Sequence, residues 1–160
     1  MLRTTVGRSR GLATLAALKR TAGEVATRPV RTVEPDVSIR ESLAKTGGGG
    51  ALIVHEAGDG HRRSVLHGVI TERDFLVKTA VDDGTRYALF DPTVREFMTP
   101  VEQIQFAEPS WPLHKCLAVM LQGGFRHLPV REVHSKGVEA MLSLRDIVAA
   151  VVEDLSLIHI

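Results

Sequence analysis

The residues best suited to ligand chemistry form two hydroxyl–carboxylate pairs, Thr71 with Asp74 and Ser143 with Asp146. Each pair follows a short apolar run and precedes a helical pattern, so we expect it where a strand runs into a helix. Free amides at a helix N-terminus donate hydrogen bonds to a phosphate, and a carboxylate accepts hydrogen bonds from ribose hydroxyls. The same spacing forms a capping box, which stabilises a helix by about 1 kcal/mol without a ligand. Both interpretations remain open from the residues alone.

A basic pair, Arg126-His127, stands just before the strand pattern Leu128–Val130. Its side chains are placed to reach a phosphate, or they form a solvated strand end. The matching place in the first half of the chain is Gly49-Gly50, which carries no base. We therefore expect the stronger ligand site in the second half of the chain, built from Ser143, Asp146 and the basic pair.

The sequence shows no catalytic or metal-ligating constellation. Cys116 lies in a helical apolar pattern with Leu113 and Met120, which is typical of a buried thiol and not of a nucleophile. The histidines are scattered, and no set of His, Asp and Glu has metal-ligand spacing. The run Gly47–Gly50 lacks the Lys and Ser/Thr of a phosphate-binding loop. We expect neither enzymatic activity nor a bound metal.

An internal repeat carries both pairs, because Gly68–Phe75 recurs 72 residues later as Ala140–Ile147. Each repeat reads as strand, helix, strand, strand, helix. Repeats of about 60 residues are too small to bury a core alone, so we expect two pseudo-symmetric βαββα repeats packed sheet to sheet in an α/β fold. In the first repeat the predicted strands are Val30–Val33, Ala51–His55 and Val65–Ile70, and the predicted helices are Ser38–Lys45 and Thr71–Val81.

Composition narrows the function classes. The chain has 160 residues with one cysteine, and its longest apolar run near the C-terminus, Ile147–Val152, is far too short to span a membrane. Residues 1–21 hold five bases and no acid, which leaves 15 bases against 19 acids elsewhere. A mildly acidic body lacks the basic surface that nucleic-acid binding needs. We therefore expect no nucleic-acid or membrane partner.

The repeats also carry a family resemblance, through the motifs GVITERDF, VREFMT, FRHLPV and MLSLRD. They resemble the tandem cystathionine-β-synthase (CBS) domain pair, or Bateman module, and the layout is similar to small plant-type organellar proteins with a single pair. The resemblance implies a regulatory module that senses AMP, ADP or ATP and modulates a partner, with a thioredoxin-type protein as one possibility. It also implies a homodimer formed through the helices. The alternative is an interaction module without nucleotide. The implied ligand residues are Thr71, Asp74, Arg126, His127, Ser143 and Asp146.

The domain plan places repeat 1 at 22–81, a linker at 82–93 and repeat 2 at 94–154. Residues 1–21 have the cationic, acid-free composition of an organellar transit peptide, so we expect a mature protein beginning near Thr21–Glu24 in the mitochondrion. A plastid or the cytoplasm is the alternative, with a disordered tail in place of the signal. The last six residues, 155–160, resemble a translated sequencing-adapter end, and we expect them not to be native.

Overall fold

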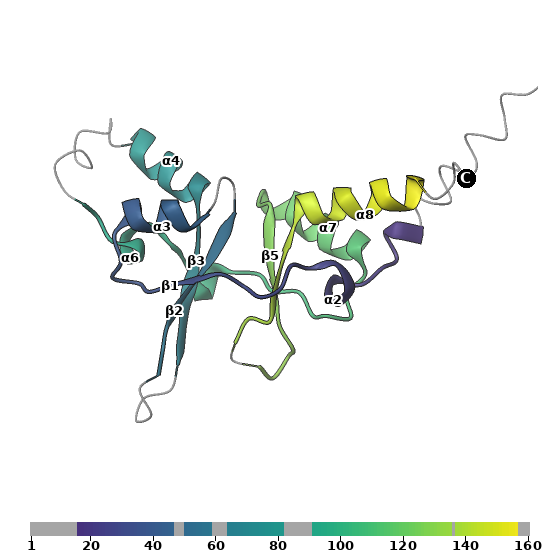
Figure 1. Ribbon diagram of the computed structural model, residues 1–160, viewed down its shortest axis with the longest axis horizontal. Helices are drawn as coiled ribbons and strands as arrows, with labels where there is room; N and C mark the ends of the chain where they lie inside the picture. The colour runs from purple at the N-terminus through teal and green to yellow at the C-terminus, as the bar shows by residue number, and fades with distance from the viewer. Residues whose placement is uncertain (1–15, 47–49, 59–63, 82–90, 136, 157–160) are drawn as a thin grey trace, which may run out of the picture. The chain divides into compact units, whose positions relative to one another are not determined.

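A computed structural model describes residues 16–46, 50–58, 64–81, 91–135 and 137–156 (Figure 1). The chain divides into two compact units, which are described separately. The first-repeat unit covers residues 30–104, and the second-repeat unit combines the chain before residue 30 with the chain from residue 105 onward. Each unit thus takes in a short helix that precedes the other repeat in the sequence: α2 (Ala22–Val25) joins the second-repeat unit, and α6 (Val94–Phe97) joins the first.

The first-repeat unit is built on a four-stranded sheet of order β1-β2-β3-β4. Strand β1 pairs with β2 in parallel, and the other neighbours are antiparallel. Gly68 allows β3 and β4 to approach closely, because a Cβ atom there would collide with the Thr99 carbonyl oxygen. The elements are β1 (Thr32–Val33), α3 (Ile39–Thr46), β2 (Ala51–Glu56), β3 (Val65–Thr71), α4 (Glu72–Val81), α6, β4 (Thr99–Pro100) and the 3-10 helix η1 (Val101–Gln103).

The second-repeat unit has a two-stranded antiparallel sheet, and a parallel bridge between Ala107 and Val130 takes the place that β1 has in the other unit. Helices α7 and α8 lie side by side (Figure 1). Gly124 caps the C-terminus of α7, and its positive φ of 67° suits glycine. The elements are α2, α7 (Leu113–Gly123), β5 (His127–Val130), β6 (Ala140–Ser143) and α8 (Leu144–Ser156).

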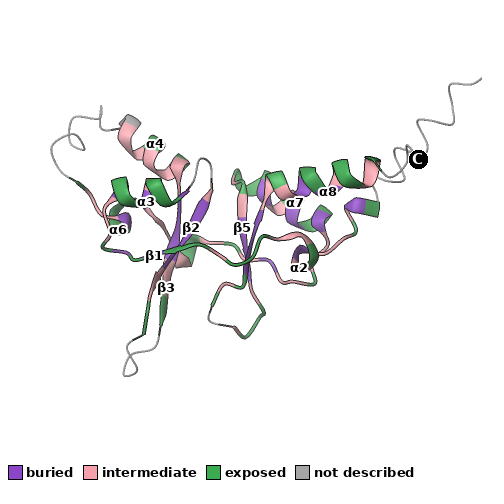
Figure 2. Cartoon of the chain, viewed as in Figure 1, coloured by how far each residue is buried: buried purple, intermediate pink, exposed green. Residues whose placement is uncertain are grey.

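Each unit has its own apolar core, gathered where helices meet strands (Figure 2). In the first-repeat unit Leu52, Ile70 and Phe97 are among the fully enclosed side chains. In the second-repeat unit Leu128 and Leu142 pack with residues of α7 and α8. The cores require both exchanged helices, since α6 supplies Phe97 and α2 supplies a fully buried Ala22.

The predicted elements of the first repeat agree with the structure to within one or two residues, and the mixed α/β class is confirmed. In the second repeat a single bridge at Ala107 stands where the first strand was predicted. The Ser38 hydroxyl accepts a hydrogen bond from the Glu41 amide at the start of α3, as a capping box requires. Helix α8 runs on to Ser156, so the first two residues of the suspected tail are helical. Residues 1–15, 47–49, 82–90 and 157–160, on which parts of the predicted leader, glycine run, linker and tail fall, lie outside the described residues.

Part of the expected leader packs into the second-repeat unit. Ala17 is fully buried, and Leu18 packs against the core. The Leu113 amide donates to the Arg20 carbonyl at 2.8 Å, and the His114 amide donates to the Leu18 carbonyl at 3.0 Å. Residues 16–21 thus satisfy amides that the first turn of α7 cannot pair internally. None of the described helices is long and apolar enough to cross a membrane.

Candidate functional site

The second hydroxyl–carboxylate pair closes β6 and opens α8. Asp146 Oδ2 accepts hydrogen bonds from the Ser143 amide and hydroxyl, both at 2.7 Å, and the Ser143 hydroxyl accepts one from the Asp146 amide at 3.2 Å. This is the predicted capping geometry. Asp146 Oδ1 accepts no hydrogen bond from any residue that the structure describes, and the side chain is only half-buried. One oxygen of the carboxylate is therefore available to a ligand.

The first pair repeats this arrangement with one addition. Asp74 Oδ2 accepts from the Thr71 amide at 2.8 Å and from its hydroxyl at 2.7 Å, while Thr99 of β4 donates to Asp74 Oδ1 at 3.3 Å. The residue that matches Thr99 in the other unit is Thr27, which is exposed and pairs with Met141 through its backbone. Asp74 is therefore more fully engaged than its counterpart.

The basic pair lies beside Ser143. His127 is directly opposite Ser143 across the β5–β6 pair, and the Leu144 amide donates to the Arg126 carbonyl at 2.9 Å. Opposed residues of antiparallel strands project their side chains from the same face, so His127 and Ser143 are neighbours. Arg126 is exposed and His127 is half-buried. The structure therefore brings Arg126, His127 and Ser143 to the start of α8, one helical turn before Asp146.

Strand register corrects the first-repeat position that the sequence suggested as the equivalent of Arg126-His127. Ala51 lies opposite Thr71, so the pair equivalent to Arg126-His127 is Gly50-Ala51 and not Gly49-Gly50. A Cβ atom on Gly50 would collide with the Arg31 guanidinium, whose Nη1 donates to the Lys45 carbonyl at 3.0 Å. A base is thus present beside Gly50. Sequence reasoning missed Arg31 because it is the residue just before β1, which α3 separates from Gly50 in the chain.

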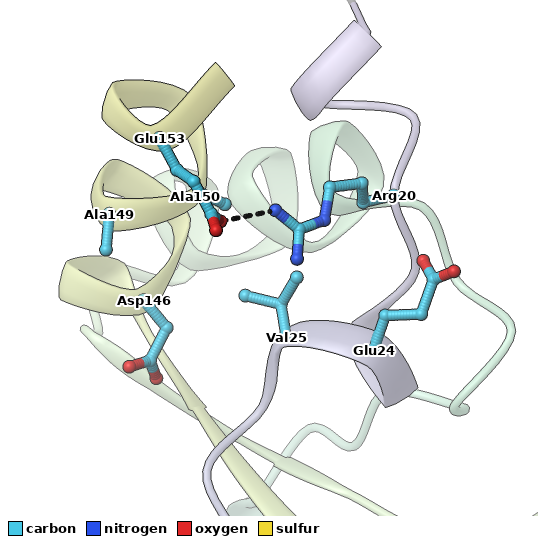
Figure 3. Close-up of a pocket in the computed structure, with 7 residues that line it drawn as sticks. All are labelled: Arg20, Glu24, Val25, Asp146, Ala149, Ala150 and Glu153. Carbon is cyan, nitrogen blue, oxygen red and sulfur yellow. Dashed lines mark hydrogen bonds and ion pairs between the residues drawn. The ribbon is translucent and has the colours of Figure 1, made fainter. Parts of the chain in front are cut away.

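A pocket of about 350 Å³ lies between α2 and α8, and we call it the α2–α8 pocket (Figure 3). One face of α8 supplies its wall, because residues spaced by three, four and seven positions share a helix face. The alanines in the middle of this face are small and leave room between the two acids. Arg20 faces α8 from the α2 side, where its Nη1 lies 3.0 Å from Glu153 Oε2. The lining residues are Arg20, Glu24, Val25, Asp146, Ala149, Ala150 and Glu153.

The equivalent place in the first-repeat unit is bridged by a side chain. The repeat aligns Ala150 with Lys78, whose Nζ donates to the Glu96 carbonyl at 2.6 Å and lies 5.4 Å from the centre of the Phe97 ring. Lys78 thus spans from α4 to α6. The Ala150 side chain ends at Cβ and is too short to bridge α8 and α2 in this way. The exchange of Ala for Lys was visible in the repeat, but its meaning depends on how α6 packs.

Ionisation in the second-repeat unit follows from its hydrogen bonds and burial. The pKa of Glu24 is lowered because its carboxylate accepts hydrogen bonds from the Thr21 amide and hydroxyl, so Glu24 is ionised at neutral pH. Burial raises the pKa of the Cys116 thiol to about 11, which fits a core thiol. Among the described residues no group of three or more His, Cys, Asp and Glu could hold a metal ion.

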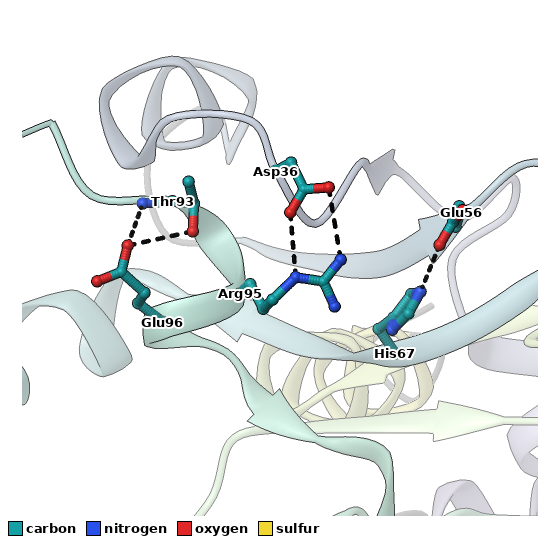
Figure 4. Close-up of polar contacts among 6 residues, drawn as sticks. All are labelled: Asp36, Glu56, His67, Thr93, Arg95 and Glu96. Carbon is teal, nitrogen blue, oxygen red and sulfur yellow. Dashed lines mark hydrogen bonds and ion pairs between the residues drawn. The ribbon is translucent and has the colours of Figure 1, made fainter.

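A separate polar cluster lies in the first-repeat unit (Figure 4). Arg95 of α6 forms an ion pair with Asp36 at 3.0 Å, and His67 contacts Glu56 at 3.0 Å. The Arg95 guanidinium lowers the pKa of the Asp36 carboxyl. Both pairs link neighbouring segments of one unit, so we assign them to the packing of α6 and the β2–β3 hairpin.

Comparison with known proteins gives the family. The model of the CBS domain matches residues 22–79 and 94–153, which cover both repeats. The chain belongs to the CBS domain family. The mitochondrial CBS domain-containing protein CBSX3 of Arabidopsis thaliana is 31% identical over 105 residues, which is 66% of this chain and 47% of CBSX3. The chain therefore matches about half the length of that relative. An uncharacterised 17.7 kDa protein of Acidianus ambivalens is 32% identical over 132 residues, covering 81% of this chain and 72% of the relative.

Solved structures of CBS proteins have the same fold. The CBS-domain protein ATU1752 from Agrobacterium tumefaciens superposes with a TM-score of 0.68 at 27% identity, over 83% of this chain and 94% of the other. The complex of CBSX2 with AMP gives a TM-score of 0.64 at 22% identity, over 83% and 96% of the two chains. The predicted family and the Bateman-module fold are thus confirmed.

Proposed function

We propose that the chain is a regulatory module that binds an adenosine nucleotide, AMP, ADP or ATP, in its second-repeat unit and modulates a partner protein. The observation that carries the proposal is Asp146 Oδ1, which accepts no hydrogen bond from the described part of the chain. It lies in the first turn of α8, whose start has Arg126 and His127 beside it. The AMP complex of CBSX2 shows that a protein of this fold binds such a ligand. The role is regulatory and not catalytic, in keeping with the CBS family.

Each residue has a role that its position suits. The start of α8 binds a phosphate, because the positive end of the helix dipole lies there and the Ser143 hydroxyl can turn from Asp146 Oδ2 to donate to a phosphate oxygen. Arg126 adds positive charge and donors there, and His127 lies beside it. Asp146 accepts hydrogen bonds from the ribose. Thr71 and Asp74 form a weaker second site, since Thr99 already occupies Asp74 Oδ1.

Titration calorimetry of the full chain with AMP, ADP and ATP tests this function, with adenosine as the ligand that lacks phosphate. We expect saturable binding of at least one nucleotide and weaker binding of adenosine. Absence of binding by all three nucleotides would leave the alternative function, an interaction module whose capping boxes only stabilise helices. The capping geometry supports that alternative, because both boxes are complete without a ligand.

We also propose self-association through the helices. Leu76 and Val77 of α4 and Val148 and Val152 of α8 are more than half exposed. Apolar side chains repeated along helix faces favour a protein contact. A related fold occurs in a hexameric CBS-CP12 protein. Light scattering at tens of micromolar is expected to give a dimer mass, and a monomer mass would contradict the proposal.

We place the protein in the mitochondrion, on the acid-free cationic composition of its first 21 residues and on the mitochondrial relative CBSX3. Imaging of a fluorescent fusion at the C-terminus tests this location. A diffuse cytosolic or a plastid signal would contradict it.

A further inference from the structure

We infer that the α2–α8 pocket receives the purine base of the nucleotide, and that Glu153 together with Arg20 recognises the edge of that base. The inference rests on the proposed function, and it names specificity residues that the sequence did not indicate. Arg20 precedes the first repeat in the chain, yet it contributes to the unit that contains the second.

Charge determines which way a nucleotide lies along α8. The start of the helix offers the positive end of the dipole with Arg126 and His127 beside it, so it attracts the phosphate. The pocket has the opposite balance, because three carboxylates, those of Glu24, Asp146 and Glu153, line it with one guanidinium. A phosphate in the pocket would be repelled, whereas a neutral base would not. The base therefore lies on the far side of Asp146 from the phosphate.

The spacing of Asp146 and Glu153 along α8 agrees with this orientation of the nucleotide. Asp146 and Glu153 are seven residues apart, which is about 10 Å along the helix at 1.5 Å per residue. A nucleoside bound by its ribose at Asp146 extends over this stretch of α8. Between the two acids the wall consists of Val25, Ala149 and Ala150, and such small apolar side chains suit the flat face of a ring. The polar groups of Glu153 and Arg20 lie at the end of the pocket away from Asp146, where the edge of the base would lie.

The chemistry of that end matches adenine. Adenine presents an exocyclic amine, which donates, next to ring nitrogens, which accept. Glu153 supplies an acceptor and Arg20 supplies donors, of which Nη1 is used by Glu153. The Arg20 side chain is 35% exposed and the Glu153 side chain 67%, so their ion pair is weak and can open to admit a base edge. The Arg20 backbone is held by the Leu113 amide, so the guanidinium starts from a fixed position.

The test compares two ligands that differ only in the amine, AMP and purine riboside 5′-monophosphate. Calorimetry on the full-length wild type is expected to show about tenfold tighter binding of AMP, the usual effect of one hydrogen bond to a charged group. Glu153→Ala is expected to reduce that ratio to near one. Asp154→Ala is the matched control, because it removes the same charge from the next residue of α8, which does not line the pocket. The ratio cancels any change in overall charge, which acts on both ligands alike.

The outcomes separate the inference from the function on which it rests. Absence of binding by AMP, ADP and ATP alike would overturn the proposed function. If only ADP or ATP binds, the same comparison is made with the matching purine riboside 5′-diphosphate or 5′-triphosphate. Binding with equal affinity for the two ligands, or a ratio that Glu153→Ala leaves unchanged, would overturn the inference alone. Arg20→Gln provides a second test, because it is expected to weaken AMP binding several-fold. Glu153→Ala is then expected to change AMP affinity less when Arg20→Gln is also present than when it is made alone. Additive effects of the two changes would contradict a shared base contact.

Discussion

Replacing Asp146 and Asp74 separately by Ala is expected to give opposite rankings for stability and for ligand affinity. Asp146 accepts two hydrogen bonds from Ser143, and its loss removes a capping box worth about 1 kcal/mol. Asp74 accepts the equivalent two and a third from Thr99, which adds about 0.5–1.5 kcal/mol. Asp74→Ala is therefore the more destabilising change, at roughly 1.5–2.5 kcal/mol in total against about 1 kcal/mol for Asp146→Ala.

Affinity is expected to rank the other way. Asp146 Oδ1 is open to a ribose, so Asp146→Ala loses hydrogen bonds to a charged acceptor, a cost of about 1.5–3 kcal/mol or roughly ten- to a hundredfold in Kd. Asp74→Ala is expected to change the Kd of the tighter site by less than about threefold, because the tighter site lies in the other unit. Denaturant unfolding measures the first ranking, and calorimetry with the tightest-binding nucleotide measures the second.

The control is Ser143→Ala, which breaks the same capping box while keeping the Asp146 carboxylate. It is expected to cost about as much stability as Asp146→Ala, with a smaller loss of affinity. Unchanged nucleotide affinity in Asp146→Ala would refute the assignment of this carboxylate to the ribose. Equal destabilisation by the two Asp→Ala changes would refute the role given to Thr99.

Three further outcomes are expected. Ala150→Lys, which copies Lys78 of the other unit, is expected to weaken nucleotide binding at least tenfold with the circular dichroism spectrum unchanged, and retained affinity would show that the ligand does not use the α2–α8 pocket. A chain shortened to begin at Ala22 is expected to be less stable by roughly 2–4 kcal/mol than one beginning at Ala16, because it loses a buried alanine, a packed leucine and two acceptors of α7 amides; equal denaturation midpoints would contradict this. The raised pKa of Cys116, about 11, keeps the thiol protonated at pH 8, so alkylation by iodoacetamide is expected to be slow in the folded protein and fast in denaturant, and equally fast labelling would show that the thiol is not buried.

The features that the sequence determined are local or repeated. A capping box needs only a hydroxyl and an acid three residues apart, and both boxes were visible at Thr71 and Ser143. The boundaries of the strands and helices followed from apolar periodicity, and the repeat doubled the evidence for each. The family followed from the same motifs. Within each repeat these features depend on residues within about ten positions of one another, where backbone propensity and pattern decide the outcome.

Contacts between distant segments were decided only by the tertiary structure. The sequence could not show that α2 and α6 would each join the unit of the other repeat, since the repeats are nearly equivalent in their apolar patterns. That exchange brings Arg20 to Glu153 and Thr99 to Asp74, and it makes residues 16–21 part of a folded unit. Arg31 likewise reaches Gly50 only because β1 pairs with β2. Such contacts follow from burying apolar faces against each other, a non-directional force that depends on the whole fold and leaves no spacing rule in the chain.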